Sequence, residues 1–204
     1  DEAEGGRIRL LHVITRLDPG GSAENTLLSV ALADRRHYAV DLAFGPTRDL
    51  GGPTAKAART CAGRWVEIPR LVRHISPLAD MRAVWDLWQL MRQGKYHLVH
   101  THTSKAGVVG RLAAFLARVP AVVHTSHGHV FYGYYGPALS RFFVWVEKAA
   151  AHLADRIVAL TAVDAAEHVD LGVASPAKFT VVHSGVDFTP LEQECGSAEA
   201  CRRQ

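Results

Sequence analysis

The chain has 204 residues, a formal net charge of +3 and 48% hydrophobic residues, values that suit one large globular domain. This hydrophobic fraction excludes disordered, collagen-like and low-complexity classes, because it is sufficient to build a buried core. Three cysteines are too few for a disulfide framework or a four-thiolate zinc site. The mild basic excess is compatible with anionic small molecules or a membrane surface, but it is too small to indicate nucleic-acid binding.

Neither an export signal nor a membrane-spanning stretch is recognisable in the sequence. The chain starts Asp-Glu-Ala-Glu, which is acidic where a secretory signal is basic. The most apolar stretch, residues 108–123, is interrupted by Arg111 and Arg118, whereas a transmembrane helix needs about 18 uninterrupted apolar residues. These features predict a cytoplasmic protein.

Apolar runs typical of buried strands alternate with segments of helical periodicity. The almost continuous apolar run 8–14 predicts the first strand, Pro19-Gly20-Gly21 ends it, and a helix is expected over 22–35. Further strands are predicted at 38–44, 65–68, 98–102, 121–125, 156–161 and 179–183. Further helices are predicted at 80–91, 104–117, 139–153 and 163–171. In the helix predicted at 80–91, the side chains expected to face the core are Met81, Val84, Trp85, Trp88 and Met91. In the helix predicted at 139–153, they are Leu139, Phe142, Phe143, Val146 and Leu153.

Strands that alternate with helices predict βαβ units and hence an α/β fold. We expect a doubly wound, Rossmann-like parallel sheet of about seven strands, covered by helices on both faces, over residues 1–187. Residues 188–204 contain too little apolar material to extend this domain. They are predicted to be a polar tail, either a linker or the truncated start of a further domain.

Ligands of open parallel sheets bind outside the carboxyl ends of the strands, so the polar segments that follow the strands are the candidate sites. The first is the turn 18–22, in which Gly20 and Gly21 allow close approach of the backbone to an anion at a helix start. A tight turn between strand and helix explains the same pair of glycines. The GxGxxG fingerprint is absent, so a nicotinamide cofactor is not predicted.

The second segment is 100–107, which follows the strand at 98–102. His100 and His102 are expected to point to opposite faces of the sheet, so that one is structural and the other faces the cleft together with Lys105. Thr103 or Ser104 is a candidate cap for the following helix.

The third segment places His124, His127 and His129 within six residues, followed by the aromatic loop 131–135. Together with the two preceding histidines they could ligate a metal. No carboxylate lies close in sequence and the spacing matches no familiar zinc signature, so we predict no metal. Neutral imidazoles that hold sugar hydroxyls or a leaving phosphate fit the pattern better. The aromatic loop could stack on a sugar or lie on a membrane, and an ordinary surface loop is the alternative.

A basic face on the helix predicted at 139–153 is the fourth candidate feature. Arg141, Trp145, Lys148 and His152 follow one another at spacings of four, three and four residues, opposite the expected core stripe. Such a face can bind anionic lipid headgroups, although most faces of this kind are simply solvated.

These segments, in this order, resemble the N-terminal domain of family 4 glycosyltransferases, which have the GT-B architecture. The segments that carry the resemblance are Gly20-Gly21 with Glu24, His97 to Gly107, Val123 to Gly128, Ala154 to Thr161, and Pro176 to Asp187. The stretch 127–131 with Gly133-Tyr134 looks most like members that build bacterial surface polysaccharide on a lipid carrier.

The resemblance implies a retaining sugar transfer, without metal or other cofactor, from a nucleotide-sugar to a saccharide or polyprenyl-linked acceptor. By matching position, His127 would bond the transferred sugar at the reacting centre, and Gly20, Gly21 and Gly128 would lie against the donor phosphates or sugar. The residues implied on the acceptor side are His102, Ser104, Lys105, His129 and Tyr132. The family also has a second domain that holds most of the donor, so the 204-residue chain is expected to be inactive alone. A contact with the inner face of the cell membrane is a further expectation.

Two other readings remain open. The N-terminal half of a nucleotide-sugar 2-epimerase has the same two-domain plan, but it needs acid and base carboxylates that the predicted strand ends do not supply. A module that binds a glycan or lipid carrier without catalysis is the second alternative.

Overall fold

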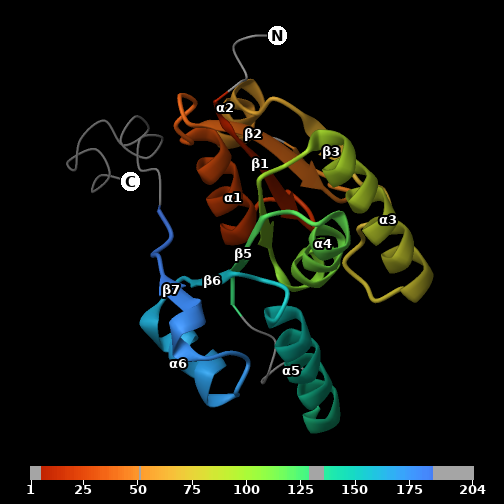
Figure 1. Ribbon diagram of the computed structural model, residues 1–204, viewed down its shortest axis with the longest axis vertical. Coiled ribbons are helices and arrows are strands. Elements are labelled where there is room, and N and C mark those ends of the chain that lie inside the picture. Colours follow the sequence, from red (N-terminus) through yellow and green to blue (C-terminus); the bar gives the residue numbers. More distant parts are fainter. Residues whose placement is uncertain (1–5, 51, 129–135, 186–204) are drawn as a thin grey trace, which may run out of the picture.

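The computed structural model describes residues 6–50, 52–128 and 136–185. Within them, seven parallel strands form one sheet in the order β3-β2-β1-β4-β5-β6-β7 (Figure 1). The strands are β1 (Ile8–Ile14), β2 (Tyr38–Phe44), β3 (Trp65–Glu67), β4 (Leu98–His102), β5 (Ala121–Ser126), β6 (Arg156–Ala159) and β7 (Phe179–Val181). The predicted Rossmann-like parallel sheet of about seven strands is therefore confirmed. The expected tail, 188–204, lies outside the described residues, so the domain boundary stays a prediction.

Helices connect the successive strands. They are α1 (Gly21–Ala31), α2 (Pro53–Cys61), α3 (Pro77–Gly94), α4 (Ser104–Ala117), α5 (Pro137–Ala151) and α6 (Ala162–Asp170), followed by the 3-10 turn η2 (Pro176–Lys178). The sequence did not predict α2. This helix is short and gives only small residues, Ala55 and Ala58, to the core, so it lacks the large apolar side chains by which the other helices were recognised.

The strand order reverses between β1 and β4, and this reversal decides which face each helix covers. From β1 the chain moves outward through β2 to β3 on one side, and then returns to β4 and continues to β7 on the other. Since such crossovers are right-handed, α1 and α2 pack on one face and α3 and α4 on the opposite face. The carboxyl ends of β1 and β4 therefore form the switch point at which ligands of such sheets bind.

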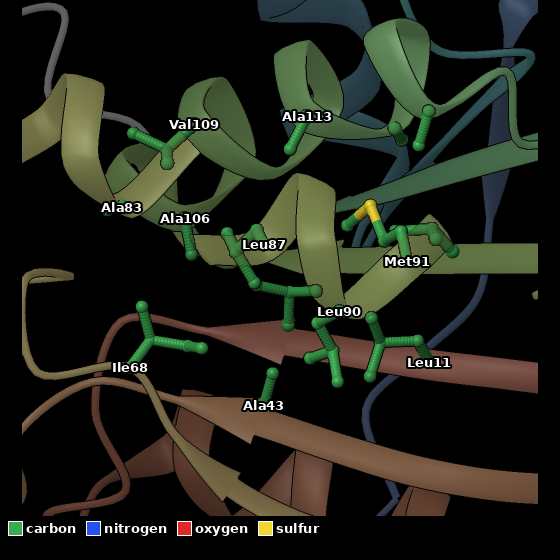
Figure 2. Packing of buried hydrophobic residues seen from close by; sticks show 14 of the residues in the cluster. Leu11, Ala43, Ile68, Ala83, Leu87, Leu90, Met91, Ala106, Val109 and Ala113 are labelled. Carbon is green, nitrogen blue, oxygen red and sulfur yellow. The ribbon is translucent and has the colours of Figure 1, made fainter. Parts of the chain in front are cut away.

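The core under α3 and α4 is built from the inward side chains of β1 and β2, among them Leu11 and Ala43, and from aliphatic residues of both helices (Figure 2). Each large aliphatic side chain that folding buries contributes about 1.5–3 kcal/mol. The buried face of α3 is Ala83, Leu87, Leu90 and Met91. The predicted stripe was partly wrong, because Met81 and Trp85 are 63% and 56% exposed.

Helix α5 also differs from its prediction. Leu139 and Phe142, expected in the core, are 41% and 48% exposed, and the buried residues of the helix are Ala150 and Ala151 at its end. A buried ion pair, Arg111 Nη2 to Glu147 Oε1 at 2.8 Å, ties this end to α4. The first half of α5 thus extends away from the sheet (Figure 1), which removes the neighbours that its apolar side chains would need for burial.

Candidate functional site

The carboxyl ends of β1, β4 and β5 lie side by side because these strands are parallel neighbours. Thr15 Oγ1, at the end of β1, lies 2.7 Å from Thr103 Oγ1 and accepts a hydrogen bond from the backbone N–H of Ala106 at 3.1 Å. These contacts join the end of β1 to the start of α4. Thr15 was not singled out in the sequence, because a single threonine after an apolar run carries no distinctive signal.

The turn between β4 and α4 has an unusual backbone. Thr103 has φ 65°, a left-handed conformation that costs free energy for a β-branched residue. Its hydroxyl donates to the carbonyl of His102, and no side chain caps α4. The predicted cap by Thr103 or Ser104 is therefore wrong, because the Thr103 hydroxyl is used within the turn and in the contact with Thr15.

Three histidines, from β1, from β4 and from the residue after β5, form a hydrogen-bonded row behind this edge. His12 Nδ1 lies 2.9 Å from His102 Nε2, and His102 Nδ1 lies 3.1 Å from His127 Nε2. His12 and His102 are buried, whereas His127, just after β5, is partly exposed. Sequence reasoning missed His12 because it sits inside an apolar strand, far from the two histidine clusters.

His100 lies beside this row but outside it. Its ring centroid is 4.2 Å from that of His102, and its Nε2 is 2.7 Å from Thr125 Oγ1. His100 and His102 thus point to the same face of the sheet, and the prediction of opposite faces is wrong. The reason is the strand period of two, which puts residues i and i+2 on one face.

Burial keeps these imidazoles neutral at pH 7. It lowers the pKa of His12 and of His127 to about 4. Burial, and then the charge of neighbouring histidines, hold the pKa of His100 and His102 well below 6.5. His124 faces α4 instead, and burial and then the adjacent Arg111 lower its pKa. Each ring in the row therefore offers one N–H donor and one acceptor nitrogen.

A metal could in principle use part of this cluster. Three ring nitrogens lie within 4.8 Å of one another, one from each of His12, His100 and His102. His12 Nδ1 and His102 Nε2 are already bonded to each other, and the cluster contains no carboxylate to balance a divalent charge. A hydrogen-bonded network accounts for this geometry without an ion.

Gly20 and Gly21 are not required by the fold of this chain. A Cβ at Gly20 would meet its nearest atom at 3.9 Å, and one at Gly21 would meet nothing within 4 Å. Both residues are exposed where α1 begins, and no side chain caps this helix start. Backbone N–H groups are thus available to an anion that approaches closely. Gly128 differs, since its φ of 95° itself favours glycine.

The acceptor-side residues implied by the resemblance have different environments. Ser104 is exposed at the first position of α4. Lys105 Nζ donates to Asp80 Oδ2 at 2.5 Å and to the carbonyl of His74 at 3.1 Å, so it ties α4 to α3. His102 is fully buried with both ring nitrogens engaged. His129 and Tyr132 lie outside the described residues.

A pocket of about 280 Å³ lies elsewhere, at the amino ends of β1 and β2. Its basic lining residues are Arg7, Arg9, Arg35 and Arg64. This pocket is at the opposite edge of the sheet from His127. The presence of a pocket is therefore not what identifies the candidate site.

The chain is similar in sequence to known glycosyltransferases. The family model of the glycosyl transferase 4-like domain matches residues 20–185. The UDP-Gal:alpha-D-GlcNAc-diphosphoundecaprenol alpha-1,3-galactosyltransferase of Escherichia coli is 38% identical over 121 residues, which are 59% of this chain and 31% of that enzyme. The chain thus spans about a third of the length of this curated relative.

Solved structures share the fold at low sequence identity. A glycosyltransferase from Rickettsia africae superposes with a TM-score of 0.63 at 16% identity, covering 95% of this chain and 50% of that one. The UDP-GlcNAc 2-epimerase of Neisseria meningitidis, bound to UDP-GlcNAc, gives a TM-score of 0.63 at 12% identity, covering 96% and 53%. The fold alone therefore does not separate transferases from epimerases.

Proposed function

Because the chain belongs to the glycosyl transferase 4-like family, we propose that it forms the acceptor-side half of a retaining glycosyltransferase. The complete enzyme transfers a sugar from a nucleotide-sugar to a glycan or lipid-linked acceptor. The E. coli relative is named for a UDP-Gal donor and a GlcNAc-diphosphoundecaprenol acceptor. A polyprenyl-linked saccharide is therefore the first acceptor to test.

The observation that carries this proposal is that His127 and the exposed glycine pair at the start of α1 lie at the same edge of the sheet, where β5 and β1 end. Gly20, Gly21 and Gly128 lie against the phosphates or sugar of the donor, with the start of α1 supplying N–H groups. His127 donates a hydrogen bond to the transferred sugar near the departing diphosphate, whose negative charge is the main feature to be stabilised.

Ser104 contributes to the acceptor side, and His129 and Tyr132 are proposed there on the resemblance alone. Lys105 and His102 receive other roles in this proposal, because the structure gives them protein partners. Lys105 fixes the start of α4 against α3 through Asp80. His102 acts behind His127 rather than on the acceptor.

The epimerase alternative has less support. The Neisseria meningitidis epimerase matches in fold at 12% identity, whereas the E. coli relative, 38% identical in sequence, is a transferase. The structure brings imidazoles and glycines to the site edge. An epimerase would need free carboxylates there. Asp80 is paired with Lys105, Asp18 accepts from the backbone N–H of Arg48, and Glu24 accepts from Thr54 Oγ1.

The proposal also places the enzyme on the cytoplasmic side of an anionic membrane. In the described ranges, no helix is both long and apolar enough to cross a bilayer. Trp145 is 65% exposed on α5 and Arg141 is exposed beside it, with Lys148 and His152 further along the helix. The acidic residue of this helix, Glu147, is neutralised by Arg111. The loop 131–135, expected to take part, lies outside the described residues.

Helix α3 adds to this surface. Since α3 and α5 follow parallel strands, both begin at the edge of the sheet that carries His127. Leu78 is 71% exposed in the first turn of α3, with Met81 and Trp85 exposed along the same helix. Exposed apolar side chains near basic residues are typical of interfacial binding. A lipid-linked acceptor would then reach the site from the bilayer on which the domain rests.

A transfer assay tests the proposal. UDP-[³H]galactose and GlcNAc-diphosphoundecaprenol are incubated with three protein samples: this chain alone, the C-terminal part of the E. coli relative alone, and both together. Other labelled UDP-hexoses are then tested as donors in the same three samples. Labelled lipid is expected only from the mixture or a fusion of the two. Transfer by this chain alone contradicts the half-enzyme proposal, and acceptor binding without transfer in any combination supports the non-catalytic module.

A further inference from the structure

The proposed function uses His127 but does not explain the two histidines behind it. His12 on β1 is 2% exposed and His102 on β4 is fully buried. Burial of two imidazoles costs free energy unless their polar nitrogens are hydrogen-bonded. The row from His12 to His127 meets that need with contacts of 2.9 and 3.1 Å.

The connectivity of this row restricts where each proton can be. Both contacts join Nδ1 of one ring to Nε2 of the next ring toward the cleft. In each contact one nitrogen carries the hydrogen and the other supplies the lone pair. If His102 carries its proton on Nδ1, then His127 Nε2 accepts, and His12 must donate from Nδ1 to His102 Nε2. If His102 carries its proton on Nε2, all three assignments reverse.

Neutral rings linked in this way must therefore all carry the proton on the same nitrogen, either Nδ1 throughout or Nε2 throughout. A mixed arrangement would place two hydrogens or two lone pairs against each other in a buried contact. A doubly protonated ring would remove this coupling, because it can donate from both of its nitrogens. Burial lowers the pKa of His12 and of His127 to about 4 and holds that of His102 well below 6.5, so the rings are neutral at pH 7.

We propose that His12 and His102 are positioning residues that hold His127 in the Nδ1–H form. This inference rests on the proposed function, because a sugar or diphosphate oxygen needs an N–H donor. His127 Nε2 is taken by His102, so Nδ1 is the nitrogen left for the ligand. The row then orients the ring and fixes its proton before the donor arrives, and preorganised donors of this kind stabilise developing charge most effectively.

The neighbouring His100 provides the matched control. Its ring is tilted against that of His102, with the ring centroids 4.2 Å apart, but its hydrogen bond goes to Thr125 Oγ1. Removing that bond with Thr125→Val perturbs the same buried region without touching either contact of the row. The tautomer of His127 should not respond to this change.

The direct test is NMR on the 204-residue chain labelled with ¹⁵N-histidine, at pH 7. Two-bond ¹H–¹⁵N correlations identify which nitrogen of each ring carries the proton, and single substitutions assign the signals. We expect His12, His102 and His127 all to be in the Nδ1–H form. Mixed forms among the three rings would overturn the coupling directly, without any variant.

Two near-isosteric variants of His12 test the direction of the effect. In His12→Asn an amide N–H replaces the donor at Nδ1, so His127 should keep its Nδ1–H form. In His12→Leu the donor is lost, and His127 should become a mixture of both tautomers. Equal spectra of His127 in these two variants, in chains that remain folded, contradict the proposal.

The outcomes separate this inference from the proposed function. Three rings uniformly in the Nε2–H form would leave the coupling intact but deprive His127 of its donor, which contradicts its proposed catalytic contact. Three rings in the Nδ1–H form, together with no sugar transfer in the assay above, would keep the positioning role and reject the transferase.

Discussion

At the scale of single residues, two glycine sites in the described part of the chain contrast with each other. Gly20 and Gly21 have open space where a side chain would be. A Cβ at Gly107 would instead come 2.6 Å from His124 Cε1, closer than packed atoms allow. The fold therefore needs Gly107, whereas Gly20 and Gly21 are free to serve a ligand.

This contrast leads to a prediction. Gly21→Ala should leave the melting temperature unchanged but weaken donor use by the joined two-domain enzyme, because the added methyl group lies where the phosphate approaches. Gly107→Ala should destabilise the chain by about 1–3 kcal/mol, since a side chain is forced into a filled space. Thermal unfolding and donor KM measure the two effects. A destabilised Gly21→Ala variant would show that the fold does need this glycine.

His127 carries the second prediction at this scale. His127→Ala in the joined enzyme should lower kcat by about 100-fold or more, the usual cost of one lost donor in a preorganised site. Acceptor KM should change far less. The measurement is steady-state transfer with the lipid-linked acceptor, and a near-normal kcat would move the chemistry away from this histidine.

Sequence reasoning singled out His127 and His102 because they cluster with other histidines, but it could not reveal His12, the buried partner of His102. His12 lies 90 residues from His102 in the chain and 2.9 Å from it in space. Only the pairing of β1 with β4 brings them together, and nothing in the local pattern records which strands become neighbours. Lys105 was placed at the acceptor for a similar reason, because its partner Asp80 lies 25 residues away.

At the scale of elements, the strands were predicted well because a strand buried on both faces is a continuous apolar run. The predicted bounds of β1, β2 and β4 agree with the structure. All helices except α2 were predicted as helices, but their buried faces were predicted only in part. The aromatic residues of α3 and α5 suggested core stripes, whereas the space beneath α3 is filled by Ala83, Leu87, Leu90 and Met91.

The exposed face of α5 leads to the third prediction. The wild-type chain should co-sediment with anionic vesicles at low salt and dissociate at high salt. Basic residues contribute about 1 kcal/mol each near such a surface, and salt screens this attraction. The double variant Arg141→Glu/Lys148→Glu should lose binding, while Arg92→Glu, at the opposite end of α3, serves as the control. Equal binding of the double variant would show that the face is only solvated.

At the scale of the whole molecule, the fold keeps five imidazoles neutral around the strand ends: His12, His100, His102, His124 and His127. The pKa of each is lowered, chiefly by burial. In the unfolded chain these groups titrate near pH 6.5. Between that pH and about 4, the unfolded state therefore binds more protons than the folded state.

The fourth prediction follows from this difference. The free energy of unfolding should be highest above pH 6.5 and fall as the pH is lowered toward 4, by about 1.4 kcal/mol per pH unit for each histidine that stays neutral in the fold. Urea titrations at pH 7, 6 and 5 measure it. His12→Asn should make the decline shallower, and a pH-independent midpoint would contradict the neutral cluster.

The central claim is that this chain is the acceptor-side half of a glycosyltransferase. Equilibrium binding of tritiated GlcNAc-diphosphoundecaprenol to the 204-residue chain in detergent tests it most directly, with undecaprenyl diphosphate as the sugar-free control and UDP-galactose as the competitor. The claim predicts saturable binding that requires the sugar and that UDP-galactose does not displace. Saturable binding of UDP-galactose, with no binding of the lipid-linked saccharide, would contradict it.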